Sequence, residues 1–277
     1  MISQGKKNNN GKKTALWLLI ALALCAIGYA LAALLDIGGK GRAQQAAQDK
    51  IRDAAITIPP QVEATPAPAP QWEGWIADYA RQPDKKVDFE ALRQRNSDIF
   101  AWVTIPDTKV DYPIAFVPKD DTYYLEHDID RQESKHGAIY MEGYNSANLS
   151  DPLTIVYGHN MKDGSMFASL HQFENEAFFD EHPVIRIYMA DYMLEYEIVA
   201  AYEAGDAHIL AQYDFLDETV FAEYLYNIYD VRDLSAKFRQ YKLSTEDRIL
   251  ALVTCVRGKD DARYFVQGVL KSNGERS

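Results

Sequence analysis

RILALVTCV, residues 248–256, and RYFVQGVL, residues 263–270, are the stretches from which the fold follows most directly. Both are rich in the β-branched and aromatic residues that favour strands, and the polar segment GKDDA, residues 258–262, separates them. We therefore expect two neighbouring antiparallel strands. Cys255 lies near the end of the first strand and Arg263 begins the second, so a hairpin in the matching register brings both side chains to one rim of the sheet.

A histidine ends another strand-like stretch, LTIVYGH, whose last residue is His159. If the three strand ends meet, a thiol, an imidazole and a guanidinium come together. A catalytic thiol needs a base to take its proton and a fixed cation to stabilise the thiolate or the oxyanion that follows. We therefore predict Cys255 as nucleophile, His159 as its acid/base partner and Arg263 as electrostatic stabiliser. The rival cation is Arg257, because residues two apart on a strand share a face.

The other stretches predict a mixed sheet or barrel with a few added helices. Strands are expected within 101–116 around a Pro-Asp turn, over 136–142, over 153–159, and within 184–204 around a turn near Ala190 and Asp191. Helices are expected over 72–82, 87–96, 165–173 and 215–241, and in the last of these the apolar residues recur at helical spacing.

The first 71 residues have the composition of an anchor and a spacer. Residues 15–35 contain no charge, and a helix of that length spans about 30 Å, the thickness of a hydrocarbon core. Lysines precede it, which predicts a cytoplasmic tail over 1–14, a single-pass membrane anchor over 15–35 and an extracellular remainder. An Ala/Pro-rich stalk is expected over 36–71 and a catalytic domain over 72–277. The alternative is a signal peptide cleaved near residues 30–32.

Charge and cysteine content narrow the class of protein. The formal net charge is −12, and an acidic body argues against a nucleic-acid partner because phosphate binding needs a positive field. Cys25 lies in the apolar segment, so it cannot pair with Cys255 if that segment spans the membrane. Cys255 is then a free thiol in an exported protein and a candidate nucleophile. The other interpretation is a buried cysteine that packs as a small hydrophobic residue.

No cofactor or metal is expected. The sequence has no Cys/His pair at zinc spacing and no glycine-rich phosphate loop. HDIDRQE, residues 127–133, has Glu133 where a calcium loop needs glycine, so we expect no calcium there. The histidines other than His159 have no motif around them, and we interpret them as structural or exposed. They are His127, His136, His171, His182 and His208.

Several motifs resemble those of one enzyme family, the sortases. LVTC, ending at Cys255, resembles the family's TLxTC motif, and Arg263 lies at the spacing of its arginine. YGHNMKDGSMF, residues 157–167, and YYLEHDIDRQESKHGAIYME, residues 123–142, are similar to the class B form. The resemblance covers about residues 72–271. It implies a mainly β fold, an eight-stranded sortase-type β-barrel with N-terminal helices and an inserted helix before the cysteine strand. We place that insertion at residues 209–244.

The resemblance also implies an activity. Class B-like sortases are cysteine transpeptidases that cleave a Pro-x-Thr-Gly-like sorting signal of secreted proteins and transfer the threonyl acyl group to a cell-wall peptidoglycan amine of Gram-positive bacteria. Water can also resolve such a thioester, as in a thiol protease. Two positions depart from the pattern. Ala251 replaces the leading Thr of the motif, and Val253 occupies a place where class B members often have Ser, which bears on the sorting signal rather than on the chemistry.

Three alternatives stay open. The first is a pilin-polymerising sortase, whose acceptor is a lysine of another protein. The second is a secreted cysteine peptidase of the NlpC/P60 type, although those enzymes place the cysteine early, near a helix start, and the histidine later. The third is a non-catalytic adhesin that keeps the fold.

Overall fold

The computed structural model describes residues 26–27, 45–57, 74–231 and 233–273. The chain divides into two compact units, Met1–Ala47 and Gln48–Ser277. The predicted membrane anchor lies outside the described residues except for residues 26 and 27, which are helical, and the predicted cytoplasmic tail lies outside them altogether. No helix among the described residues is long and apolar enough to cross a membrane. Within the predicted stalk, the described part is helical over 45–55 and then enters strand β1.

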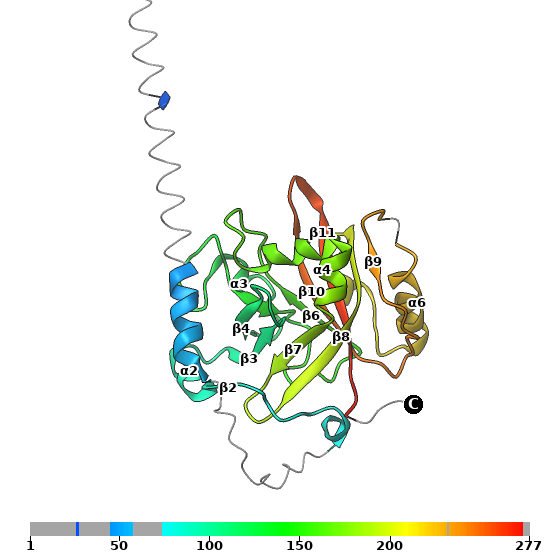
Figure 1. The fold of residues 1–277 in the computed structure, drawn as a ribbon, viewed down its shortest axis with the longest axis horizontal. Helices are drawn as coiled ribbons and strands as arrows, with labels where there is room; N and C mark the ends of the chain where they lie inside the picture. The colour runs from blue at the N-terminus through cyan, green and yellow to red at the C-terminus, as the bar shows by residue number, and fades with distance from the viewer. Residues whose placement is uncertain (1–25, 28–44, 58–73, 232, 274–277) are drawn as a thin grey trace, which may run out of the picture. The chain divides into compact units, whose positions relative to one another are not determined.

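The second unit is built around a closed eight-stranded β-barrel, which confirms the predicted fold class (Figure 1). The strands neighbour each other in the order β11-β10-β6-β5-β4-β3-β7-β8, and β8 pairs with β11 to close the barrel. The pairs β6–β10 and β4–β5 are parallel, and the other barrel pairs are antiparallel. The barrel strands are β3 (Ile99–Thr104), β4 (Asp111–Ala115), β5 (Ile139–Met141), β6 (Leu153–Tyr157), β7 (Val184–Tyr188), β8 (Met193–Gly205), β10 (Ile249–Val256) and β11 (Lys259–Leu270).

Short elements are added to this barrel. Strand β9 (Lys237–Phe238) extends the sheet beside β8, and β1 (Ile56–Thr57) pairs with β2 (Lys86–Val87). The helices are η1 (Gly74–Asp78), α2 (Phe89–Arg95), α3 (Tyr123–Glu126), η2 (Phe167–Glu174), α4 (Glu176–Glu181), α5 (Ile209–Gln212) and α6 (Glu218–Ile228). The helices predicted near residues 72–82 and 165–173 are therefore short 3-10 helices.

The helix predicted over 215–241 was too long. The structure gives α6, which ends at Ile228, and the chain then runs through a loop into β9. Asp217 caps α6 by accepting hydrogen bonds from the backbone of Thr219 and Val220. The apolar spacing beyond the helix reflects loop residues that pack on the barrel, Val231 and Tyr241 among them.

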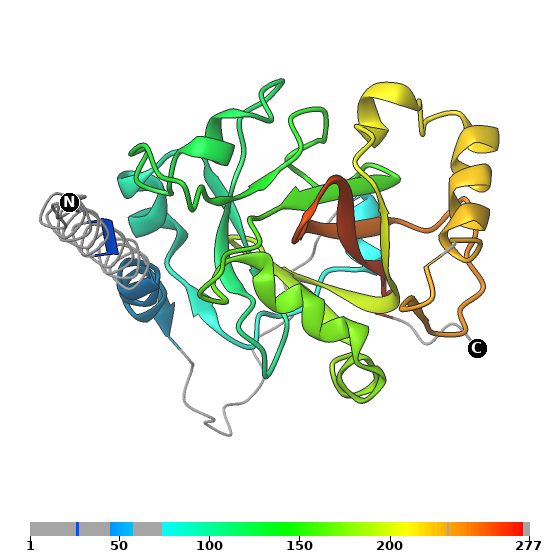
Figure 2. The same ribbon diagram turned by 90° about the horizontal axis from the view of Figure 1, so that it is seen from above.

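Side chains alternate between two buried layers along the barrel strands. On β10, Leu250 and Leu252 join the cluster inside the barrel, while Ala251 and Val253 join a cluster on its outer face. The outer cluster also contains Phe221 and other residues of α6, and α6 lies on the β9 side of the barrel in both views (Figure 1, Figure 2). Because both faces of β10 are covered, its sequence is apolar almost without interruption.

The hairpin between β10 and β11 is tighter than predicted. Val256 pairs with Lys259, so only Arg257 and Gly258 form the turn, and the polar segment 258–262 is largely strand. The register is irregular between Cys255 and Val256, the signature of a β-bulge. The extra residues of this bulge, 260–262, lie on β11, because Cys255 pairs with Arg263 and Val256 pairs with Lys259.

Candidate active site

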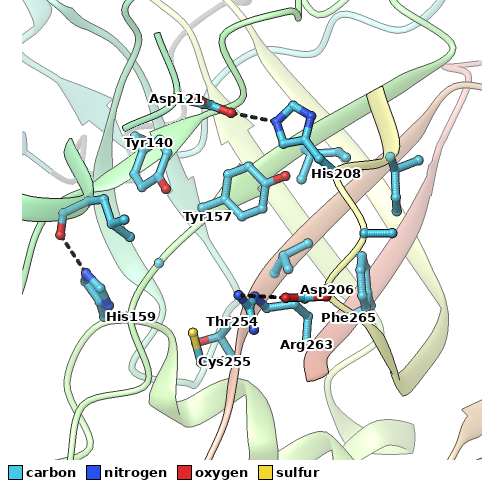
Figure 3. Close-up of a pocket in the computed structure, with 16 residues that line it drawn as sticks. Asp121, Tyr140, Tyr157, His159, Asp206, His208, Thr254, Cys255, Arg263 and Phe265 are labelled. Carbon is cyan, nitrogen blue, oxygen red and sulfur yellow. Dashed lines mark hydrogen bonds and ion pairs between the residues drawn. The ribbon is translucent and has the colours of Figure 1, made fainter. Parts of the chain in front are cut away.

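A cavity of about 200 Å³ opens on the outer face of the barrel between β6, β10, β11 and the segment after β8 (Figure 3). Its lining includes Cys255, His159 and Arg263, the three residues predicted from the sequence. Ile155, Val253 and Phe265 supply an apolar floor, since all three belong to the outer cluster. The structure therefore brings the thiol, the imidazole and the guanidinium to one hollow.

Alternation along β10 explains the position of Cys255. Val253 and Cys255 are two residues apart, so both face outward. Val253 is buried in the outer cluster, whereas Cys255 lies beyond that cluster. Its side chain is exposed, and it is a free cysteine. Cys255 and Arg263 are direct partners in the β10–β11 register. The cross-strand pair thus places the guanidinium beside the thiol.

His159 follows β6 in a loop that packs closely against Gly137. A Cβ built on Gly137 would lie 2.9 Å from His159 Cδ2 and 2.5 Å from the carbonyl oxygen of Tyr124, and Gly137 has φ +54°. The imidazole Nε2 lies 2.7 Å from the Leu125 carbonyl oxygen. A carbonyl only accepts, so this contact places the proton on Nε2 and leaves Nδ1 as the nitrogen that can exchange a proton.

Arg263 is held by backbone carbonyls. Its Nη1 donates to the carbonyl oxygens of Asp260 at 3.0 Å and Ala262 at 2.9 Å, and Nη2 lies 3.9 Å from Asp206 Oδ2. These contacts fix the planar group and leave other N–H donors for a ligand. Arg257, the rival cation, lines a different cavity. Arg257 lies in the two-residue turn and not on the strand, so the alternation that would have given it the face of Cys255 does not extend to it.

The far end of the cavity holds polar residues that the sequence did not single out for the site. His208 Nε2 lies 2.6 Å from Asp121 Oδ2 and 3.1 Å from Glu142 Oε2, and the Tyr157 hydroxyl donates to Glu142 at 2.9 Å. Glu142 is fully buried, and burial raises its pKa above the ordinary value of 4.5. Burial likewise raises the pKa of Tyr140 and of Tyr157. The alternation of side chains along β5 and β6 could have placed Tyr140 and Tyr157 on the face of the cavity. No local sequence pattern indicates the contact between Asp121 and His208, because the two residues are far apart in the chain.

The same far end contains the one group of possible metal ligands found among the described residues. Asp121, Glu142 and His208 offer ligand atoms within 4.8 Å of one another. These atoms already bond to each other and to Tyr157, so the cluster is explained as an ion pair that ties the segment after β8 to the barrel.

Comparison with known proteins identifies a consistent group of relatives. A family model described as a Sortase domain matches residues 103–271. Sortase B of Listeria monocytogenes is 37% identical over 181 residues, which are 65% of this chain and 72% of that protein. The crystal structure of Clostridium perfringens sortase B has a TM-score of 0.60 and 28% identity, and the match covers 66% of this chain and 100% of that one. Bacillus anthracis sortase B, solved in complex with AAEK1, has a TM-score of 0.60 and 29% identity over 70% of this chain and 88% of that one.

Proposed function

The chain belongs to the sortase family of transpeptidases, in its class B branch, and from this premise we propose the reaction that it performs. It cleaves the C-terminal sorting signal of secreted proteins through a thioester on Cys255. It then transfers the acyl group to an amine of the cell-wall peptidoglycan or its precursor. The observation that carries this proposal is the shared cavity of Cys255, His159 and Arg263.

Each of the three residues has a distinct task. The Cys255 sulfur attacks the carbonyl carbon of the signal's threonine, and its proton passes to His159 at Nδ1. Arg263 stabilises the oxyanion of the tetrahedral intermediate. When the carbon–nitrogen bond breaks, His159 returns the proton to the leaving amine, and the acyl group stays on sulfur. An acceptor amine then attacks the thioester, gives up a proton to His159, and releases Cys255.

The cellular setting follows from the same proposal. A substrate that is secreted and an acceptor in the wall require an enzyme of the cell envelope. The apolar residues 15–35 would anchor the chain in the cell membrane as a single span, with the barrel outside.

A turnover assay with the full chain tests the proposal. Fluorogenic peptides that carry different sorting signals are incubated with and without triglycine or diaminopimelate. Wild type should cleave at least one signal, and added amine should appear in the product as a new amide. Without amine, slow hydrolysis should remain because water also attacks thioesters. Cys255→Ala should abolish both reactions.

Cys25→Ser provides the matched control, because it removes the other cysteine of the chain and should leave turnover unchanged. Near-normal activity of Cys255→Ala would exclude a cysteine mechanism. Failure of any amine to enter the product would make the protein a peptidase rather than a transpeptidase.

A further inference from the structure

The backbone carbonyl of Cys255 is held by side chains rather than by a neighbouring strand. In the parallel β6–β10 ladder, the backbone N–H of Gly158 donates to the Val253 carbonyl at 3.1 Å. The next carbonyl along this edge of β10 is that of Cys255, two residues on. It accepts instead from Asn160 Nδ2 at 2.8 Å and lies 3.0 Å from His171 Nε2.

His171 is itself fixed on its other nitrogen and on one face. Its Nδ1 lies 2.7 Å from Glu174 Oε1, and its ring stacks on Tyr264 with 4.8 Å between centroids. His171 belongs to the 3-10 helix η2, while Tyr264 belongs to β11. His171 also borders the second cavity, about 350 Å³, together with Asn160, Glu174 and Arg257. The loop after β6, the helix η2 and the strands β10 and β11 therefore meet at the backbone of Cys255.

A hydrogen-bonded chain runs from Glu174 to the Cys255 carbonyl. That carbonyl only accepts, so Asn160 Nδ2 donates to it with one of its two N–H bonds. The other N–H can donate to His171 Nε2, which lies 3.0 Å away, while His171 Nδ1 lies 2.7 Å from Glu174 Oε1. A ring that carries its proton on Nδ1 therefore donates to Glu174 and accepts from Asn160, and it holds the amide against the carbonyl.

We infer that Asn160 and His171, supported by Glu174, are positioning residues that clamp the Cys255 carbonyl and so aim its sulfur at His159. The inference rests on the proposed role of Cys255 as nucleophile. The regular β6–β10 pairing ends at Val253, and the side chains of Asn160 and His171 restrain the backbone beyond it. Asn160 directly follows His159. Its hydrogen bond to the Cys255 carbonyl therefore links the loop after β6, which carries the imidazole, to the end of β10, which carries the thiol.

Four variants of the full chain separate the parts of this clamp. Asn160→Ala removes one donor to the carbonyl. His171→Phe keeps a ring that can stack on Tyr264 but removes both nitrogens. His171→Gln keeps a neutral hydrogen-bonding group at the reach of Nε2, and Glu174→Gln removes the carboxylate that lies against Nδ1.

Turnover of a fluorogenic sorting-signal peptide gives the first measurement. Asn160→Ala and His171→Phe should each lower kcat about 10-fold with KM little changed, because a misplaced nucleophile slows the chemical step. The kcat of His171→Gln should be well above that of His171→Phe. The kcat of Glu174→Gln should lie between the values of wild type and His171→Phe. His182→Phe is the matched control, since His182 also stacks on an aromatic ring, that of Phe178, but lies outside the clamp.

Alkylation by iodoacetamide gives a second measurement that needs no peptide substrate. Mass spectrometry measures the alkylation rate at Cys255 in wild type and in each variant. The rate should differ from wild type in Asn160→Ala and His171→Phe, where the thiol has moved relative to His159, and it should stay at the wild-type value in His182→Phe; wild-type rates in all three variants would contradict the clamp.

The outcomes separate this inference from the proposed function. If wild type turns over, Cys255→Ala is inactive, and both Asn160→Ala and His171→Phe keep wild-type kcat, the clamp is wrong and the proposed function stands. If Cys255→Ala remains active, the proposed function fails, and with it the premise of the clamp. Equal loss in His171→Gln and His171→Phe, with a matching loss of thermal stability, would reduce His171 to a structural role.

Discussion

At the scale of single residues, Arg263 is the cation that the cavity favours over Arg257. It pairs directly with Cys255 across the hairpin and lines the same hollow. We expect Arg263→Ala to lower kcat by about 10²–10³, the usual cost of one preorganised donor to an oxyanion. Arg263→Lys should lose nearly as much, since lysine keeps the charge but not the planar fork that two backbone carbonyls now orient. Steady-state kinetics with a cleavable signal peptide measures both.

Arg257→Ala is the comparison for that experiment. Its side chain lines the second cavity, so its removal should change kcat only slightly. The assignment of the stabilising cation would be reversed if Arg257→Ala were the crippled variant and Arg263→Ala retained most activity.

A second residue-scale prediction concerns the pH dependence of stability. Burial raises the pKa of Glu142 above 4.5, so at intermediate pH the folded protein binds a proton that the unfolded chain has released. The contribution of Glu142 to the free energy of unfolding therefore falls as pH rises through that window. Glu142→Gln does not titrate, so its stability relative to wild type should increase as the pH rises above 4.5, the ordinary pKa of this carboxyl group.

Denaturant unfolding at several pH values measures this difference. Glu246→Gln replaces an exposed carboxylate with the same amide, and its difference from wild type should stay nearly constant. A Glu142→Gln difference that is independent of pH, or that moves the other way, would show that the bonds to Tyr157 and His208 outweigh burial.

At the scale of elements, the loop that follows β6 depends on a close approach at Gly158. A Cβ there would lie 2.4 Å from Ile139 Cδ1 and 2.7 Å from Phe167 Cγ. Gly158→Ala should therefore cost about 1–3 kcal/mol in the free energy of unfolding, as overpacking usually does. It should also lower kcat, because the displaced backbone leads directly into His159.

Gly205→Ala makes the same substitution where a Cβ would meet nothing within 4 Å. Calorimetry and turnover on the two variants should separate the clash from the general effect of replacing glycine. Equal thermal stability of the two variants would contradict the crowding at β6.

The strands were more predictable from the sequence than the elements between them. β10 and β11 carry β-branched and aromatic runs, and both strands were placed correctly up to the start of β11. The length of α6 was not predictable, because loop residues that pack on the barrel repeat the apolar spacing of a helix. The bulge after Cys255 was also missed, since it depends on how β10 meets β11 and not on either strand alone.

The site divides in the same way. Cys255, His159 and Arg263 stood out because each lies at a strand end within a motif, and the cavity unites them, while their catalytic roles stay predictions. His171 and His208 were interpreted as structural or exposed, because nothing adjacent in the sequence marks their partners. Those partners, Cys255 and Asp121, are many residues away and are brought close only by the completed barrel.

At the scale of the whole molecule, we expect the N-terminal segment to decide where the protein resides. Residues 15–35 are uncharged, so the full chain should remain with membranes after an alkaline wash. A variant that lacks these residues should be released into the supernatant with its fluorogenic turnover intact. Recovery of a shortened chain that begins near residue 33 would instead identify a cleaved signal peptide.

The pairing of β11 with both β10 and β8 has a consequence for biosynthesis. Arg263 and the strand that closes the barrel are among the last described residues of the chain, while His159 is translated about one hundred residues earlier. Long-range strand pairing of this kind is slow, and it cannot begin before the partner strand has left the ribosome. The nascent chain therefore carries a histidine strand with no thiol and no guanidinium beside it. A nascent chain that stops before β10 and β11 therefore lacks the cavity, and it cannot attack the secreted proteins made beside it.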